Sequence, residues 1–545
     1  MPYLRLVRKE MQSSLPKLAF MAGLGGVANA MVLASINAGA QIAGKSDRGS
    51  LWGVALFLLG LFLFVKSQQY MVITAAAEIE AIIHKLRIRL IDAVRRSEVQ
   101  AIEKLGRARI VAAITTDSAI LTQASSTLIF AVQGVVLVVC VSFYIAYLSL
   151  ATFVLTAIVF GATAALFNAK GRELAEGVQK AAASTARLFD RFMDMLNGIK
   201  EVRLNKSRSD DLFAEIVEVS RVSANTKIVT EAESAKRAIF AQTAMFLLLG
   251  IIVFAGPALT QTLNGGSVSK SITTLLFVVG ACIHLVQSVP VLANADAAAD
   301  RLETLAAEID THVRSPELIA PAAGVGEFKL IELRRVMFRY FDKSTEVSFT
   351  VGPIDFALRP GDAVFIVGGN GSGKSTFLKL LAGLYAPEEG EIVLDGTVIG
   401  DANRNVYRSL VAAIFSDYHL FFRLFGIASP DAEEVRGLLD ELELTHKTGV
   451  GPDGAFQTLE LSAGQRRRLA LFVTLLEHRR VLLLDEVTSD QDPDFRRKFY
   501  LDLLPRLVQA GITIVVVTHD DRYLNDLKVP IRKLRMEDGR LVEEG

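Results

Sequence analysis

Apolar and polar stretches alternate along the first half of the chain. Six apolar stretches are each long enough to cross a bilayer as a helix, which takes about 20 residues. They cover residues 18–41, 51–72, 120–147, 150–169, 238–260 and 271–295. Only a few residues separate the third from the fourth, so we expect these two to form a tight hairpin. The pattern predicts a polytopic helical membrane domain.

The polar segments between these stretches differ in charge. Long helical segments follow the second and fourth stretches and are rich in Lys and Arg, whereas the opposite loops carry little beyond Lys45, Arg48 and Lys270. Positive charge favours the cytoplasmic side of a membrane. Both long loops and both termini are therefore expected in the cytoplasm.

The N-terminus imitates a secretory signal peptide, with basic residues, an apolar run and the small residues Ala28-Asn29-Ala30. The apolar run continues to Ile36, however, and further membrane-length stretches follow. We expect an uncleaved first helix in a multi-pass membrane protein.

Several polar side chains lie within the predicted spans. They are Asn29, Asn37, Gln41, Gln123, Gln133, Gln242, His284 and Gln287. Two interpretations stay open for each, hydrogen bonding between helices or contact with a transported substrate. His284 and Gln287 share a helix face, and Pro290 follows one turn later. The last span is therefore the first candidate for the wall of a substrate cavity.

The texture of the chain changes near residue 327. Short β-branched strands then alternate with helical segments, which is typical of an α/β nucleotide-binding domain. We predict a membrane domain over 1–311, a Pro/Gly-containing linker over 312–326 and an α/β domain over 327–545. The terminal segment has an Asp-Gly turn and predicts a closing hairpin.

Composition adds two exclusions. Lys plus Arg and Asp plus Glu each number 59, so net charge points to no nucleic-acid partner. Cys140 and Cys282 are the two cysteines of the chain, and both lie in apolar runs. They are expected to be small apolar side chains, with no disulfide or metal role.

The pattern Gly368-x4-Gly373-Lys374-Ser375 follows an apolar strand and opens a helix. This is the context of a P-loop, whose backbone N–H groups surround phosphate. Lys374 is expected to reach the β- and γ-phosphate oxygens, and Ser375 to bind Mg²⁺.

Two further strands end in groups suited to a nucleotide site. Asp485 and Glu486 follow a buried strand, where the first acid can hold Mg²⁺ and the second can polarise water toward the γ-phosphate. His519 follows a third apolar strand and is expected near the γ-phosphate.

The segment Leu461-Ser462-Ala463-Gly464-Gln465 precedes a basic helix. Small residues at a helix N-terminus form an anion site. Because one P-loop already supplies a complete cradle, a second anion site implies that ATP is held between two nucleotide-binding domains. One chain has one such domain, so two copies of the chain are the minimal assembly.

The order GGNGSGKST, LSAGQ, LLLDE, SDQD and THD resembles an ATP-binding-cassette (ABC) ATPase, and six preceding spans resemble an ABC exporter half-transporter. This resemblance implies that Glu486 and His519 are catalytic, with Glu486 as the base, and that Asp492 lies in the loop joining the two ATP sites. It implies ATP contacts from Tyr340, Gly368, Asn370, Gly371, Gly373, Lys374, Ser375, Thr376, Ser462, Gly464 and Gln465, with Tyr340 stacking on adenine. Ala463 and Val487 depart mildly from the family pattern.

A larger departure lies in the segment AIFSDYHLFF, residues 413–422. ABC ATPases usually end this strand in a glutamine that binds Mg²⁺, whereas this chain has Ser416 followed by Asp417. Serine is too short to span the same gap. We expect either a water bridge from Ser416 or a direct Mg²⁺ contact from Asp417.

Four segments are similar to the cyclic-peptide and siderophore exporter group, which includes pyoverdine-pathway and syringomycin-type transporters. They are AIFSDYHLF, GAFQTLELSAGQRRRLAL, DQDPDFRRKFY and MLNGIKEVRLN. The resemblance implies a homodimer that uses ATP and Mg²⁺ to move a peptide or siderophore-like substrate across the bilayer into the periplasm. Short coupling helices are expected near Glu98 to Lys104 and Asn205 to Asp211, with His419 to Phe422 forming part of their docking surface.

Three alternatives stay open. They are a lipid or multidrug exporter of the same architecture, an importer built on the exporter plan, and a membrane-anchored ATPase that moves nothing. The LSAGQ segment and the six spans disfavour the last of these.

Overall fold

The computed structural model describes residues 2–11, 14–43, 51–148, 150–169, 171–251, 254, 265–311, 328–341, 348–427, 430–520 and 522–543. Its contacts divide the chain into two compact units. The membrane unit contains Met1–Ala93 and Gly106–Glu308, and the ATPase unit contains Val94–Leu105 and Ile309–Gly545. The expected linker over 312–326 lies outside the described residues.

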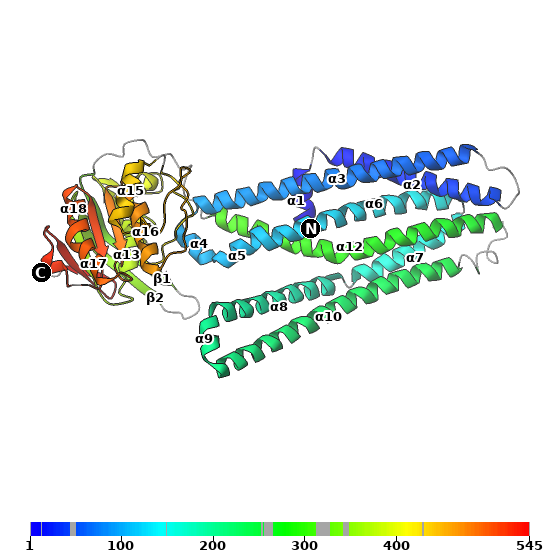
Figure 1. Cartoon of the computed structure of the whole chain (residues 1–545). Helices are drawn as coiled ribbons and strands as arrows, with labels where there is room; N and C mark the ends of the chain where they lie inside the picture. Colours follow the sequence, from blue (N-terminus) through cyan, green and yellow to red (C-terminus); the bar gives the residue numbers. More distant parts are fainter. Residues whose placement is uncertain are drawn as a thin grey trace. The chain divides into compact units, whose positions relative to one another are not determined.

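The membrane unit is helical throughout its described part (Figure 1). Its helices are α1 (Pro2–Glu10), α2 (Leu15–Ala43), α3 (Leu51–Arg96), α5 (Arg107–Ala112), α6 (Ser118–Leu148), α7 (Leu150–Ala169), α8 (Gly171–Asn197), α9 (Ile199–Leu204), α10 (Lys206–Gly250) and α12 (Gly265–Thr311). A π-helical turn, Ala113–Asp117, connects α5 to α6.

Three helical stretches in the described residues are long and apolar enough to cross a membrane, namely Pro16–Ile36, Leu51–Arg96 and Arg107–Tyr147. They contain most of the first predicted span and all of the second and third. The fourth and sixth predicted spans lie in α7 and α12, and the fifth runs from α10 past Ile251 into residues that are not described.

Helix pairing in the membrane unit follows the sequence pattern closely. The predicted hairpin is confirmed, because α6 ends at Leu148 and α7 begins at Leu150. Figure 1 shows α8 and α10 running side by side, with α9 at the turn between them. Helix α12 continues through Pro290 to Thr311, past the end of the last predicted span.

Two carboxylate–guanidinium pairs join α12 to the segment before α6. Asp117 pairs with Arg301 at 2.5 Å, and Arg109 pairs with Glu308 at 2.6 Å. The N-terminal α1 also packs into this unit, because Tyr3 is 1% exposed and its N–H donates to Asp296 Oδ1 at 2.9 Å. The first helices are thus part of the packed membrane unit.

The ATPase unit contains two sheets. The strands are β1 (Ile331–Phe341), β2 (Ser348–Leu358), β3 (Ala363–Val367), β4 (Glu389–Leu394), β5 (Thr397–Val398), β6 (Val411–Ile414), β7 (Val481–Asp485), β8 (Thr513–Val517), β9 (Arg532–Glu537) and β10 (Arg540–Glu543). One sheet is antiparallel in the order β2-β1-β4-β5, and the other has the order β10-β9-β3-β8-β7-β6.

The helices of this unit are α4 (Val99–Leu105), α13 (Lys374–Leu381), α14 (Arg404–Arg408), α15 (Ala432–Glu441), α16 (Ala463–Leu476), α17 (Pro493–Lys498) and α18 (Leu504–Gln509). Strands β3, β7 and β8 are buried along their whole length, as parallel strands covered on both faces should be. Phe377 belongs to the apolar core that includes β1 and β2, and Phe472 to the second core that includes α16.

The topology of the larger sheet positions the candidate site. Strands β9, β3, β8, β7 and β6 are parallel neighbours, so their carboxyl ends lie at one edge. In such sheets ligands bind at that edge. At the other end of the order, β9 and β10 form the predicted closing hairpin, with Asp538 at φ 44° and Gly539 at φ 79°. The predicted combination of a helical membrane region with an α/β domain is confirmed.

Candidate active site

The loop 368–373 joins β3 to α13 and needs glycine at several of its positions. Gly371 and Gly373 have φ values of 78° and 105°, which other residues adopt only with strain. A side chain at Gly368 would lie 2.4 Å from the carbonyl oxygen of Met536. The glycine spacing read from the sequence therefore matches a tight main-chain loop at the start of a helix.

The groups around this loop fit a bound phosphate. Lys374 Nζ donates to the carbonyl oxygens of Gly368 and Gly369 at 2.9 and 2.8 Å. Burial lowers the pKa of Lys374, although Glu486 and Asp485 act in the opposite direction. Within the described chain, the buried Ser372 Oγ has no hydrogen-bond partner. A multi-oxygen anion at the N-terminus of α13 would satisfy both groups.

The remaining predicted P-loop residues lie where the motif requires. Asn370 is exposed in the loop, and Thr376 is buried in the first turn of α13. Ser375 Oγ donates to Asp485 Oδ2 at 2.8 Å, which joins the P-loop helix to the end of β7. Asp485 is 1% exposed. A hydroxyl and a carboxylate oxygen are the donors that Mg²⁺ prefers, so this pair fits that ion.

Ser416 and Asp417 differ in their contacts with the predicted Mg²⁺ site. The Ser416 main-chain N–H donates to Asp485 Oδ2 at 3.4 Å, which brings the end of β6 beside the Ser375–Asp485 pair. Both side chains are exposed. The Asp417 carboxylate makes no hydrogen bond or ion pair with the described residues. A Mg²⁺ contact from either side chain stays a prediction.

Glu486 and His519 face each other across the ends of β7 and β8. His519 Nε2 lies 2.9 Å from Glu486 Oε1. The main chain of Glu486 has φ 53°, and its N–H donates to the Val517 oxygen at 3.0 Å. A left-handed conformation at a non-glycine residue is uncommon and holds the carboxylate at a defined place. Both side chains line an open cavity of about 460 Å³.

The LSAGQ segment caps α16. Ser462 Oγ accepts from the Gln465 N–H at 3.3 Å, and Gln465 Oε1 accepts from the Ser462 N–H at 3.1 Å. This reciprocal capping box fixes the helix start. A side chain at Gly464 would come within 2.8 Å of the Asp490 oxygen. Glycine is therefore required at 464, and Ser462 and Ala463 remain exposed at the helix end.

Neighbouring contacts that the sequence did not reveal hold α16 to the loop after β7. Arg467 donates to the Glu486 oxygen at 2.9 Å and pairs with Asp490 at 2.9 Å. Arg468 donates to Gln491 Oε1 at 2.8 Å, and Gln491 Nε2 donates to the Gly464 oxygen at 3.0 Å. The signal that could have found them is a run of three arginines in an otherwise apolar helix.

Asp492, the residue expected to join the two ATP sites, begins α17. Its carboxylate accepts from the Phe495 N–H at 2.8 Å and pairs with Arg468. The Phe495 N–H and the Arg468 guanidinium lower the pKa of Asp492. The loop is thus tied to α16 within the same chain.

Tyr340, the expected adenine-stacking residue, lies on β1 in the antiparallel sheet. Its ring meets those of Phe338 and Tyr385 edge-on, with centroids 5.0 and 6.2 Å away. Its hydroxyl donates to Tyr385 Oη at 3.1 Å, and 37% of the residue is exposed. The Tyr340 hydroxyl is therefore held by Tyr385, while part of the residue stays accessible to a ligand.

Tyr385 also contacts α4, the short helix predicted near Glu98 to Lys104. Tyr385 Oη donates to Glu103 Oε2 at 2.5 Å, and Lys379 Nζ lies 3.2 Å from Glu103 Oε1. Burial, followed by the hydrogen bonds with Glu103 and Tyr340, raises the pKa of Tyr385. Lys379 lies on α13, so α4 contacts the P-loop helix directly.

The start of α4 is held by Glu98. Its carboxylate oxygens contact Arg404 at 3.3 Å and Arg408 at 2.7 Å, and the Glu98 side chain is 15% exposed. The sequence predicted this helix near Glu98 to Lys104, but no sequence pattern indicated its partners.

The second predicted coupling segment, Asn205 to Asp211, was placed too far along the chain. The short helix is α9, Ile199–Leu204, and it precedes that segment. Asn205 instead caps the long α10, since its side chain accepts from the Arg208 N–H at 3.1 Å. Leu204 at the end of α9 is 88% exposed.

An aromatic patch follows β6 in the ATPase unit. It consists of His419, Phe421, Phe422 and Phe425, whose rings meet edge-on. The three phenylalanines are 60, 63 and 56% exposed. The predicted docking surface at His419 to Phe422 thus coincides with an exposed apolar surface, which is a common mark of an interface.

The predicted cavity wall on the last span is only partly described. Gln287 is exposed, and the side chain of His284 lies outside the described residues.

Comparison with known proteins identifies both halves of the chain. Residues 17–281 match the ABC transporter transmembrane region, and residues 351–489 match the ABC transporter ATPase family. The chain is 32% identical to the ATP-binding protein SyrD of Pseudomonas syringae pv. syringae over 98% of this chain and 95% of that protein.

Two further relatives share this organisation. The ATP-dependent lipid A-core flippase of Paraburkholderia xenovorans (strain LB400) is 25% identical over 92% of this chain and 84% of that protein. The solved structure of a bacterial Atm1-family ABC exporter with ATP bound has a TM-score of 0.75 and 20% identity, covering 98% of this chain and 95% of that chain. This last likeness shows the fold.

These findings confirm the predicted ATP hydrolase coupled to transmembrane transport. The P-loop, the Ser375–Asp485 pair and the Glu486–His519 pair lie at the carboxyl edge of the larger sheet, where the sequence predicted the ATP site. The chain belongs to the ABC transporter family, as an exporter half-transporter whose membrane region and ATPase domain share one polypeptide.

Proposed function

We propose that two copies of this chain form an exporter that moves a peptide or peptide-derived siderophore from the cytoplasm to the periplasm. The observation that supports a dimer is the exposed N-terminus of α16. Ser462 and Ala463 are exposed there, and Ser462, Gly464 and Gln465 make no hydrogen bond to the P-loop within the described residues. An anion site that its own P-loop does not use is available to a second copy.

In this assembly each ATP site takes its P-loop from one copy and its LSAGQ helix end from the other. ATP supplies the phosphoanhydride bond, and Mg²⁺ neutralises charge on its phosphate oxygens. Lys374 and the loop N–H groups bind the phosphates, Ser375 and Asp485 hold the Mg²⁺, and the accessible part of Tyr340 packs on adenine.

Glu486 is the general base of the proposed reaction. Its carboxylate would accept a proton from water as the water attacks the terminal phosphorus, while the bond from that phosphorus to the bridging oxygen breaks and ADP leaves. His519 orients that carboxylate through the 2.9 Å contact. The left-handed backbone at Glu486 and the Arg467 bond to its carbonyl keep the base at the end of β7.

Two short helices transmit the ATPase cycle to the membrane unit. Helix α4 transmits through Glu98 and Glu103, whose partners include the P-loop helix. Helix α9 carries exposed apolar residues, and the aromatic patch offers a surface of matching character, so we propose that α9 docks on an aromatic patch within the dimer. ATP binding then closes the two ATPase units, and hydrolysis reopens them.

The cargo class rests on the resemblance of four sequence segments to the cyclic-peptide and siderophore exporters. The expected location is a bacterial inner membrane, with both termini and the ATPase unit in the cytoplasm. The relative named as a lipid A-core flippase favours a second candidate, a lipid exporter of the same architecture.

ATPase measurements in lipid nanodiscs separate these candidates. The purified dimer is assayed with cyclic peptides, peptide siderophores, and lipids added to a neutral bilayer. Stimulation by peptides or peptide siderophores, and none by lipids, supports the proposal. Stimulation by lipids alone transfers the assignment to a lipid exporter.

A further inference from the structure

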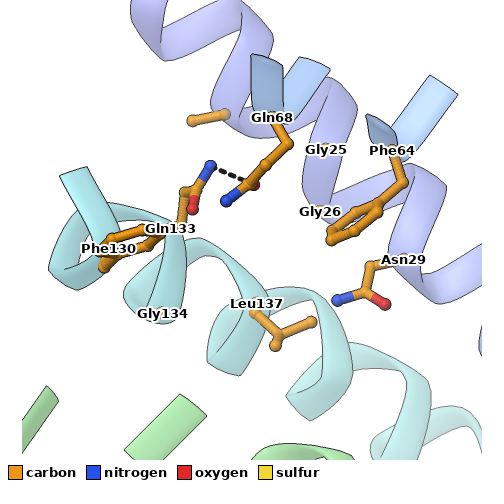
Figure 2. A pocket seen from close by; sticks show the side chains of 10 residues that line it. Gly25, Gly26, Asn29, Phe64, Gln68, Phe130, Gln133, Gly134 and Leu137 are labelled. Carbon is orange, nitrogen blue, oxygen red and sulfur yellow. Dashed lines mark hydrogen bonds between the residues drawn. The ribbon is translucent and has the colours of Figure 1, made fainter. Parts of the chain in front are cut away.

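The membrane unit contains a cavity between α2, α3 and α6 that no motif predicted. Its volume is about 190 Å³. Three carboxamide side chains line it, one from each helix, namely Asn29, Gln68 and Gln133. Figure 2 shows these side chains in the space between the three helices, with Gln68 and Gln133 joined by a hydrogen bond.

The helix spacing explains why three amides meet here. A side chain at Gly25 would lie 2.8 Å from Ser67 Oγ, and one at Gly26 would lie 2.8 Å from Val136 Cγ1. Helix α2 therefore approaches α3 and α6 closely at these glycines. Asn29 follows them by one helical turn and shares their face, so it points into the same space. Phe64 is one turn before Gln68 and adds an apolar wall.

The hydrogen bonds of the three amides are incomplete. Gln133 Nε2 donates to Gln68 Oε1 at 2.6 Å and weakly to Met71 Sδ at 3.5 Å. Within the described residues, Gln68 Nε2, Gln133 Oε1 and the whole amide of Asn29 have no protein partner. All three residues are half-buried, so a ligand that pairs with the free amide groups and covers them gains affinity.

The charge and the hydrogen-bonding groups of the cavity lining indicate which kind of ligand it can bind. None of the described residues that line the cavity is charged. The free groups include both donors and acceptors, which suits a carboxamide, a hydroxyl or a peptide amide. Because a water molecule occupies about 30 Å³, the cavity holds one side chain or one short amide-bearing group, and not a whole peptide.

We propose that this cavity is a subsite for one uncharged, hydrogen-bonding portion of the cargo, recognised by Asn29, Gln68 and Gln133. The proposal rests on the proposed peptide cargo. The proposed contact with the substrate lies in the first three spans, whereas His284 and Gln287 had suggested the last span.

The test combines changes in the peptide with changes in the protein. Cyclic peptides carrying Asn or Leu at each position in turn are titrated against the nanodisc ATPase of the full-length protein. One hydrogen bond changes the half-stimulating concentration by about 5- to 10-fold. At one or more positions the Asn peptide is expected to act at the lower concentration. Asn29→Leu or Gln68→Leu should abolish that preference.

Gln123→Leu is the matched control, because Gln123 is an exposed amide on α6 that does not line the cavity. It should retain the preference. The peptide comparison in the unchanged protein needs no variant to fold. If peptides stimulate without any Asn preference, or if the preference survives both Asn29→Leu and Gln68→Leu, the subsite is wrong and the export function stands. If no peptide stimulates the unchanged protein, the proposed cargo fails and the subsite with it.

Discussion

Glu98 offers a direct way to separate ATP hydrolysis from transport. Its carboxylate holds the start of α4 against Arg404 and Arg408, at 3.3 and 2.7 Å. Glu98→Gln keeps the shape of the side chain and removes its charge. The change leaves two guanidinium groups without their shared carboxylate, and Arg404 is only 9% exposed.

The size of the effect follows from what the arginines retain. Removing one partner of a fully buried ion pair costs about 3–5 kcal/mol, whereas an exposed pair contributes about 1 kcal/mol or less. Arg404 keeps Asp401 at 3.1 Å, and Arg408 keeps the Gly383 oxygen at 2.8 Å. An intermediate cost of about 2 kcal/mol is therefore expected, which shifts the docking equilibrium of α4 by about 30-fold.

Two assays report this shift. Hydrogen exchange in the peptide that contains 99–105 should become about 30-fold faster in Glu98→Gln, because α4 leaves its docked state more often. Peptide stimulation of the ATPase and transport should fall, while basal hydrolysis continues. Asp401→Asn is the control, since Asp401 is 50% exposed and its loss should cost less than about 1 kcal/mol. Unchanged exchange in Glu98→Gln would refute the energetic reasoning. Faster exchange with full transport would refute the role of α4 in transmission.

Three further predictions concern the ATP site. Glu486→Gln should keep ATP binding, trap a closed dimer and reduce phosphate release at least about 100-fold, and turnover near the unchanged rate would remove Glu486 as the base. Lys374→Ala and Ser462→Arg should each abolish ATPase activity, whereas mixed dimers of the two variants should regain activity, because one of their two sites has both an intact P-loop and an intact LSAGQ end; no recovery, with mixed dimers verified by pull-down, contradicts the shared sites. Asp417→Asn should raise the Mg²⁺ concentration needed for hydrolysis if this carboxylate binds the ion, and Ser416→Ala should do so if the hydroxyl acts through water; if neither variant changes the Mg²⁺ dependence, the two residues have no part in metal binding.

The elements that local sequence determines were predictable. The P-loop, the strand ending at Asp485 and the cap at Ser462 each depend on a few consecutive residues whose conformational needs are known. The hairpin between α6 and α7 likewise followed from the few residues that separate the third and fourth apolar stretches.

Features that depend on distant partners were not predictable in the same way. Glu98 meets Arg408, which lies 310 positions along the chain, and no local pattern encodes that contact. The amide cavity depends on how three separate helices are rotated relative to each other, whereas the sequence showed only individual polar residues. The shift from 205–211 to α9 depends on whether Asn205 caps the following helix or belongs to the short one. The Glu98 contacts and the amide cavity depend on tertiary packing, which the pattern of a single sequence segment does not show.

Transport into inside-out membrane vesicles tests the central proposal most directly. Vesicles containing the protein are given ATP, Mg²⁺ and a labelled cyclic peptide that stimulates the ATPase, with Glu486→Gln vesicles as the control. The account predicts ATP-dependent accumulation of the peptide in the vesicles and none in the control. ATP-driven loss of peptide from preloaded vesicles, or hydrolysis with no movement of the peptide in either direction, would contradict it.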